Sequence, residues 1–201
     1  QIAEMIAAHP GRFRGLGAVP LQDPAAATRY LKRIKDEFGL SGVELGSNIN
    51  GTMLGDPSFE AFYAEAEALG LSIFVHALHP VAAKAAAMPP VDTAFVYFPI
   101  DVAMAAASIA MNGVLDRFPG LRIAFSHGGG AIGSIAGRMD TGWNATNGYG
   151  GRMAEAPSAT LRKMFFDSNV LDPEYLCYLV RNVAPGRIFA GTDYPYPIMQ
   201  Q

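Results

Sequence analysis

The stretch 122–130, Arg-Ile-Ala-Phe-Ser-His-Gly-Gly-Gly, constrains the fold of this chain more than any other. An apolar segment with the β-forming residues Ile123 and Phe125 ends at His127. The three glycines that follow indicate a turn that larger residues could not adopt. Residues 131–139 then have the pattern of a helix. We therefore expect His127 where a buried strand gives way to a helix, at the carboxyl edge of an α/β sheet, where ligands bind.

Two other segments repeat this pattern. Residues 71–75 are apolar and run into His76, and residues 187–192 run into Asp193. The carboxyl ends of parallel strands meet at one edge of a sheet, so we expect His76, His127 and Asp193 to lie together. Two imidazoles and a carboxylate form a site for one divalent metal, with zinc the commonest occupant and manganese an alternative. Such a metal polarises a carbonyl or carboxylate of a substrate.

Strands and helices alternate along the whole chain. Six strands are predicted, at 13–19, 40–45, 71–76, 122–127, 163–168 and 187–193, with a long apolar helix at 101–118 and loops at 46–55, 77–100 and 142–151. Three helices should begin at Asp-Pro pairs, where aspartate caps the first turn and proline follows it: Asp23-Pro24, Asp56-Pro57 and Asp172-Pro173. The alternation predicts parallel strands in a single domain over residues 1–201, either an open doubly wound sheet or a (β/α)8 barrel.

Composition argues against several classes of partner. The 201 residues carry 15 Lys and Arg against 18 Asp and Glu, a net charge of -3, so the chain has no basic footprint for nucleic acid or an anionic membrane. The uncharged run 102–115 is too short to span a bilayer, and no cationic segment precedes an apolar one at the start. The one cysteine, Cys177, is predicted to be a core thiol, in keeping with a cytoplasmic protein.

Three further polar residues lie near the same predicted edge. Asn48 and Asn50 fall in the glycine-rich loop 46–55, and His79 follows His76 by three residues. Each is a candidate for substrate binding. Each also has an ordinary structural interpretation, since asparagine is a common turn residue and His79 precedes Pro80.

Residues 128–133 also satisfy G-x-G-x-x-G after a strand, as in a dinucleotide-binding turn. The acidic residue expected about twenty positions later is missing. The next strand supplies Asp167, which lies 34 residues beyond Gly133. A serine hydrolase is also disfavoured, because His-Gly-Gly-Gly occurs without a G-x-S-x-G elbow.

Taken together, these motifs resemble the amidohydrolase-related family (amidohydrolase 2) of aminocarboxymuconate-semialdehyde decarboxylase. The resemblance covers nearly the whole chain. The residues that carry it are Pro10-Gly11-Arg12-Phe13, Gly17-Ala18-Val19-Pro20, Phe74-Val75-His76, Asp116 to Ile123, Ser126 to Gly130, Gly137-Arg138 and Gly191-Thr192-Asp193-Tyr194-Pro195.

The resemblance implies a (β/α)8 barrel with one divalent metal, held by His76 from the fifth strand and Asp193 from the eighth. His127, after the sixth strand, would be the acid/base beside the metal-bound water. The family's first strand carries a His-x-His pair that this sequence lacks. We therefore expect an incomplete barrel that contains strands three to eight.

The function expected from this resemblance is non-oxidative decarboxylation of an aromatic or unsaturated carboxylate, a small-molecule substrate. Two alternatives stay open: a metal-dependent hydrolase of an ester, lactone or amide, and a non-catalytic remnant of the fold. A homodimer is the assembly we would test first.

Overall fold

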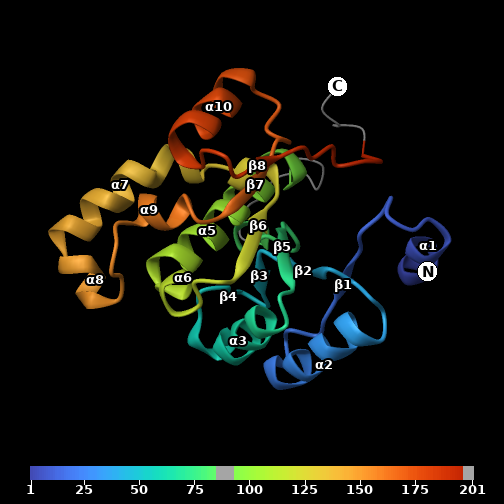
Figure 1. The fold of residues 1–201 in the computed structure, drawn as a ribbon. Helices are drawn as coiled ribbons and strands as arrows, with labels where there is room; N and C mark the ends of the chain where they lie inside the picture. Colours follow the sequence, from blue (N-terminus) through green and yellow to red (C-terminus); the bar gives the residue numbers. More distant parts are fainter. Residues whose placement is uncertain (85–92, 197–201) are drawn as a thin grey trace.

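The computed structural model describes residues 1–84 and 93–196, and its centre is a curved parallel sheet with helices packed along its outer side (Figure 1). Each strand pairs in parallel with its neighbours, as the alternation of strands and helices predicts. The six strands are β1 (Leu16–Ala18), β2 (Gly42–Gly46), β5 (Ser72–His76), β6 (Arg122–Phe125), β7 (Phe165–Asp167) and β8 (Ile188–Phe189).

The order of the strands decides between the two predicted architectures. It is β1-β2-β5-β6-β7-β8, the order in which the strands occur in the sequence. A doubly wound sheet reverses its order at a switch point, which this sheet lacks among the described residues. The sheet is therefore an arc of an α/β barrel, incomplete as expected, with β1 and β8 at its edges. The same order rules out the dinucleotide-binding interpretation of residues 128–133.

The helices after β1 lie between successive strands, and three helical segments begin at the predicted Asp-Pro pairs. The Asp23 carboxylate accepts the Ala26 N–H at 3.0 Å, and the Asp172 carboxylate accepts the Glu174 N–H at 3.0 Å. Asp56 caps a short 3-10 turn, Pro57–Phe59, that leads into α3. The helices are α1 (Ile2–Ala8), α2 (Pro24–Asp36), α3 (Glu60–Ala68), α5 (Phe98–Met111), α6 (Val114–Arg117), α7 (Ile132–Ala145), α8 (Asn147–Gly151), α9 (Pro157–Leu161) and α10 (Pro173–Tyr178).

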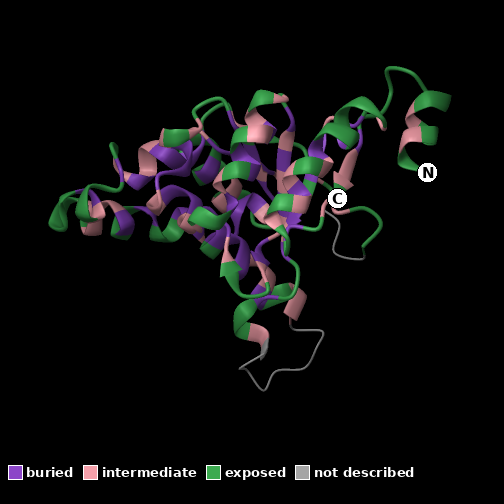
Figure 2. Ribbon diagram, turned by 90° about the horizontal axis from the view of Figure 1, so that it is seen from below, coloured by how far each residue is buried: buried purple, intermediate pink, exposed green. Residues whose placement is uncertain are grey.

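The core lies between the outer face of the sheet and these helices, where buried residues concentrate in Figure 2. Alternate residues of a strand point to opposite faces of the sheet. The set that packs against the helices is fully or almost fully buried: Val43, Leu45, Ile73, Val75, Ile123 and Phe125. The other set, which includes Glu44, Phe74 and Ala124, is less buried and faces the inner side of the arc.

Helix α5 crosses this core and begins earlier than predicted. With the preceding π-helical turn, Thr93–Tyr97, it forms a helical stretch of 19 residues whose mean hydropathy of 1.7 would allow a membrane span by length and composition alone. Its buried apolar residues belong to the hydrophobic core, and core helices pass the same test. The stretch is therefore weak evidence for a membrane protein.

Several predicted elements need correction. The helix expected at 101–118 breaks at Gly113, which has a φ of +63°, so that α6 is separate from α5. The loop expected at 46–55 contains a hairpin of β3 (Asn48–Ile49) and β4 (Thr52–Met53). Part of the irregular segment expected at 77–100 lies outside the described residues, and its first part includes a 3-10 helix, Val81–Lys84.

Two further predictions concern the last third of the chain. The first residues of the segment predicted as a loop at 142–151 belong to the end of α7, which reaches Ala145. The rest, labelled α8, has positive φ at every residue and forms a left-handed turn, as a loop prediction allows. The Tyr149 hydroxyl donates to the Met139 carbonyl at 2.6 Å and holds this turn against α7. Cys177 was expected in the core but is exposed. It lies on α10, a short helix with no residue in the buried class.

Candidate active site

The register of the sheet brings the ends of three strands to one level. Val75 pairs with Phe125, and Phe125 pairs with Phe166. His76 is the last residue of β5 and Asp167 the last of β7, so both lie at the carboxyl edge. This is the edge at which the active sites of α/β barrels are built.

His127 and Asp193 reach this edge through an unusual backbone conformation. Strict alternation along β6 would direct Ser126 inward and His127 outward, toward the helices. Instead His127 has a φ of +55° and Asp193 a φ of +56°, both in the left-handed region. For a residue with a side chain this conformation costs about 1–2 kcal/mol. Strain of this kind occurs preferentially at functional sites.

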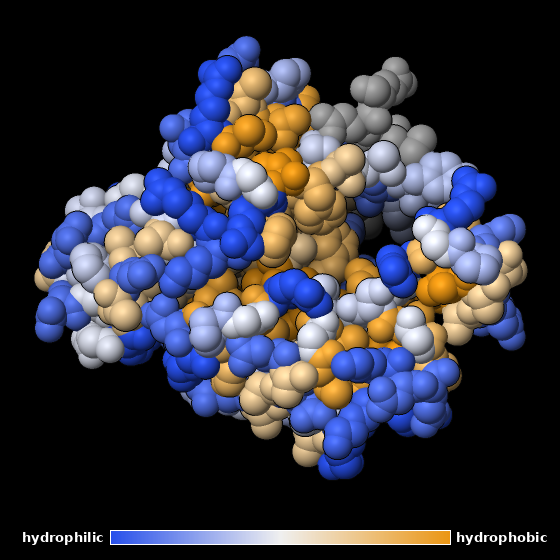
Figure 3. All heavy atoms as spheres, viewed as in Figure 1, coloured by the Kyte–Doolittle hydropathy of each residue, from blue (hydrophilic) through white to orange (hydrophobic). Residues whose placement is uncertain are grey.

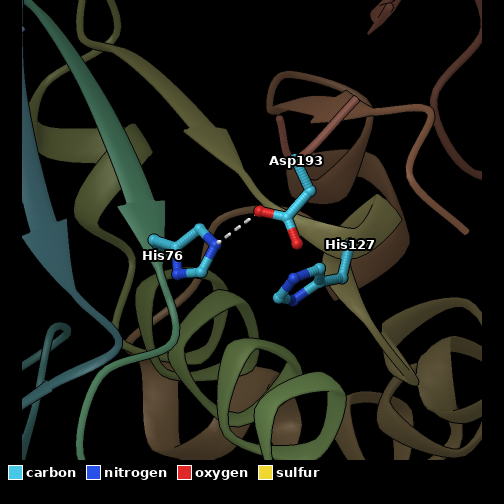
Figure 4. Close-up of side chains that lie close together, drawn as sticks. All are labelled: His76, His127 and Asp193. Atoms are coloured by element: carbon cyan, nitrogen blue, oxygen red, sulfur yellow. Dashed lines mark ion pairs between the residues drawn. The ribbon is translucent and has the colours of Figure 1, made fainter. Parts of the chain in front are cut away.

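The three predicted residues converge. Their donor atoms lie within 4.8 Å of one another, and Nε2 of His76 is 3.7 Å from Oδ1 of Asp193 (Figure 4). Two ligands that each lie about 2.1 Å from one zinc can be at most about 4.2 Å apart. The pair His76 and Asp193 meets this limit. For His127 the structure gives only the wider limit of 4.8 Å, which also fits an unligated base beside the ion.

The tautomer of His76 suits a metal ligand. Its Nδ1 is 3.1 Å from the carbonyl oxygen of Ala77, an acceptor only, so this contact places the ring proton on Nδ1. The lone pair of Nε2 is then free and faces Asp193. Histidine ligands are commonly oriented by such a bond from the second ring nitrogen.

His127 is held in its neutral form. Its pKa is lowered from 6.5 to about 4, first because burial disfavours the imidazolium and second because His76 lies beside it, while the Asp193 carboxylate acts in the opposite direction. The two imidazole centroids are 5.0 Å apart, and the Phe98 ring stacks on His127 at 6.3 Å. His127 is therefore a proton acceptor at neutral pH.

Sequence reasoning missed Asp167 as a residue of this site. Its side chain is buried, and Oδ1 accepts the Gly128 N–H at 2.9 Å and the Asn169 N–H at 3.1 Å. Burial raises the pKa of the carboxyl group. Asp167 thereby fixes the turn that follows His127. It could have been found, because it ends an apolar strand just as His76 does.

The remaining candidates lie apart from this cluster. Asn48 is buried, and its side-chain amide group donates to the His79 carbonyl and the Asp101 carboxylate and accepts the Gly51 N–H. Asn50 is exposed in the hairpin turn, and His79 is exposed with a φ of +52°. A substrate-binding role for any of the three stays a prediction.

A parallel barrel arc with a metal-competent cluster at its carboxyl edge defines a class of metal-dependent α/β enzymes. Comparison with known families shows which family of this class the chain belongs to. The family model described as Amidohydrolase matches residues 1–200. The chain belongs to the amidohydrolase family, as its motifs predict.

Individual relatives agree with this assignment. The chain is 35% identical over 199 residues to 2-amino-3-carboxymuconate-6-semialdehyde decarboxylase from Dictyostelium discoideum, covering 98% of this chain and 55% of the relative. It is 29% identical to 5-carboxyvanillate decarboxylase from Sphingomonas paucimobilis, with a TM-score of 0.87 over 97% of this chain and 60% of that structure.

A third similarity shows the fold alone. Dihydroxybenzoic acid decarboxylase from Polaromonas, solved with bound manganese and the inhibitor 2-nitroresorcinol, is 20% identical with a TM-score of 0.76 and covers 98% of this chain and 63% of that one. The chain thus spans between 55% and 63% of the length of these relatives.

Proposed function

We propose that the full-length protein is a metal-dependent decarboxylase that releases carbon dioxide from an aromatic or unsaturated carboxylate. The observation that carries the proposal is the convergence of His76, His127 and Asp193 at the carboxyl edge of the arc. Two of the relatives named above support the reaction type, because by their names one is a decarboxylase of carboxyvanillate and the other a decarboxylase of a carboxymuconate semialdehyde.

The donor set fits one divalent metal. An imidazole nitrogen and a carboxylate oxygen suit zinc, and they also suit manganese. We propose that His76 and Asp193 hold the ion and that zinc is its identity, with manganese as the alternative. When bound, the metal would draw electron density from the substrate's oxygens and neutralise its carboxylate.

His127 would carry the proton. Because its imidazole is neutral at pH 7, it accepts a proton from an acidic group of the substrate before it can donate one. It then returns this proton to the carbon that bears the carboxylate. The bond between the two carbons then breaks, its electron pair returns to the substrate's unsaturated system and restores the double bond that was used in the protonation, and carbon dioxide leaves. The stacked Phe98 ring keeps water from one face of the imidazole.

The first test is a screen of the full-length protein loaded with zinc or manganese. We expect carbon dioxide release from at least one aryl or dienyl carboxylate. Turnover of esters, lactones or amides without carbon dioxide would instead identify a hydrolase. A protein that binds neither metal and turns over none of these compounds would be a non-catalytic remnant of the fold.

A variant separates the two possible roles of His127. Loss of a general acid/base lowers kcat by about 100-fold to 10,000-fold, so His127→Gln should show this loss while its metal content is unchanged. His76→Ala should lose both metal and activity. His9→Gln is the matched control, because His9 is exposed at the end of α1. Loss of metal from His127→Gln would make His127 a ligand.

A further inference from the structure

Asp101, on α5, is a buried acidic residue that the proposed reaction does not use. Hydrophilic residues cover much of the face of the molecule shown in Figure 3, whereas only 2% of Asp101 is exposed. Acidic residues are seldom buried to this extent unless other groups pair with them. The hydrogen-bond partners of Asp101 therefore indicate its role.

Three donors from two loops pair with the Asp101 carboxylate. The Ser47 hydroxyl and the Asn48 side-chain N–H donate to Oδ2, the latter at 3.0 Å. The Val81 backbone N–H donates to Oδ1 at 2.9 Å. Ser47 and Asn48 directly follow β2, and Val81 lies in the loop that follows β5. These four residues, which we call the Asp101 network, join α5 to the loops that leave two neighbouring strands at the carboxyl edge.

The loop after β5 also carries the group that orients His76. The Ala77 carbonyl oxygen lies 3.1 Å from Nδ1 of His76 and accepts its proton. The same loop is fixed a few residues later by its bond to Asp101 and by the Asn48 side chain, which donates to the His79 carbonyl at 3.1 Å. The φ of His79 is +52°, a strained value that persists only where the surrounding contacts impose it. The orientation of the His76 ring therefore depends on the Asp101 network.

Helix α5 also contacts both histidines directly. Phe98 lies three residues before Asp101 on this helix, and its ring meets the His76 ring edge-on, with the centroids 6.2 Å apart. The same ring stacks on His127 at 6.3 Å. Because Asp101 ties α5 to the loop after β5, it fixes Phe98 relative to the carbonyl that orients His76. One buried carboxylate thus acts on the His76 ring from two sides.

We propose that Asp101 is a positioning residue for the metal centre. By fixing α5 and the loop after β5, it holds the His76 imidazole with its proton on Nδ1 and its Nε2 lone pair toward Asp193. The inference rests on the proposed function in one respect, that His76 is a metal ligand. It also gives Asn48 a structural role, since both N–H groups of its side chain are used, one on Asp101 and one on the His79 carbonyl.

The first test is the tautomer of His76 in the metal-free full-length protein, measured by long-range nitrogen–proton NMR of the neutral ring. We expect wild type to carry the proton on Nδ1. Asp101→Asn keeps the shape of the side chain but replaces one oxygen with an NH2 group, which cannot accept the hydrogen bonds that this oxygen receives. Both tautomers should then be present. The same single tautomer in the variant as in wild type, or a wild type with its proton on Nε2, would overturn the proposal.

The second readout is the affinity for zinc or manganese, measured by calorimetry. Removing a group that orients a ligand histidine weakens metal binding about 10-fold to 100-fold, and we expect about tenfold for Asp101→Asn because Asp101 acts through the loop. Ser108→Ala is the matched control. Ser108 lies two helical turns further along the same face of α5, and its hydroxyl accepts the Gly55 N–H at 2.9 Å. This variant also removes a bond between α5 and a loop but leaves the loop after β5 untouched, so its metal affinity should be unchanged. Equal weakening in both variants would overturn the proposal.

A second variant covers the case in which Asp101→Asn does not fold. Ser47→Ala removes one donor from the same carboxylate and should change the tautomer and the metal affinity in the same direction, by a smaller amount. In that case an unchanged tautomer and affinity in Ser47→Ala would overturn the proposal. Wild type that releases no carbon dioxide but binds metal more tightly than Asp101→Asn would overturn the proposed reaction and support the role of Asp101.

Discussion

His127 owes its chemistry to where its ring is placed. A partly buried imidazole beside a second histidine is harder to protonate than one in water, and the nearby carboxylate of Asp193 does not compensate. The residue is therefore a base at neutral pH. A cation held by His76 and Asp193 would act in the same direction, since it also disfavours the imidazolium.

This placement predicts a pH dependence of stability. Because the folded pKa of His127 is about 4 and the ordinary value is 6.5, the unfolded chain binds more protons between these values. The free energy of unfolding of metal-free protein should therefore fall as the pH decreases from about 6.5 to 4. Denaturant unfolding at several pH values measures this, and His127→Gln should lack this contribution. An NMR titration midpoint for His127 near 6.5 would contradict the prediction.

The turn between β6 and α7 is the element on which the position of His127 depends. Gly130, with a φ of +59°, lies so close to the Pro99 backbone that a Cβ atom would clash with its carbonyl. Asp167, at the end of the neighbouring strand, accepts the Gly128 N–H. One side of the turn is thus fixed by close packing and the other by a buried carboxyl group.

Replacing Asp167 should loosen this turn. Asp167→Leu leaves the Gly128 and Asn169 N–H groups unpaired, and each buried unpaired donor costs about 1–3 kcal/mol. We expect a loss of about 2 kcal/mol or more in the free energy of unfolding. Asp167→Asn keeps an accepting oxygen and is the matched control, with a loss of less than about 1 kcal/mol. Both losses are measured by denaturant unfolding. Equal losses in the two variants would contradict the prediction that Asp167 stabilises the turn by accepting these two hydrogen bonds.

At the scale of the whole molecule, the candidate site joins distant parts of the chain. His76 ends β5 in the middle of the sheet, whereas Asp193 follows β8 at its edge, so β6 and β7 lie between them. An ion shared by both residues would tie the last strand to the centre of the arc. A ligand that binds only the folded protein stabilises it by an amount that grows with the logarithm of the free ligand concentration relative to the dissociation constant.

Metal should therefore raise the thermal stability of the full-length protein. At a free concentration about 100 times the dissociation constant, the expected gain is about 2.7 kcal/mol. Differential scanning calorimetry before and after addition of zinc or manganese measures this gain, and a chelator should reverse it. Asp193→Ala should show a much smaller shift. A full-sized shift in that variant would place the metal elsewhere.

Much of this protein could be read from its sequence. Strand-forming runs, Asp-Pro helix starts and glycine turns are local signals, so six parallel strands and the residues at their ends followed from the chain alone. The three residues of the cluster were identified in this way because strand ends share one edge. The exposure of Cys177 was not predicted, because an apolar pattern does not say which side of a short helix is covered.

The alternation of strands and helices by itself left the architecture open, and although the family resemblance predicted a barrel, the strand order in the tertiary structure confirmed it. The tertiary structure also decided the direction of the key side chains. Barrel and doubly wound sheets share the same alternation of elements, and the order of strands, a property of long-range pairing, distinguishes them. Alternation along β6 would have turned His127 away from the site, and its left-handed φ of +55° turns it back. The pairing of Asp167 with Gly128 also arises from a contact between separate parts of the chain. Local residue preferences carry no information about such contacts.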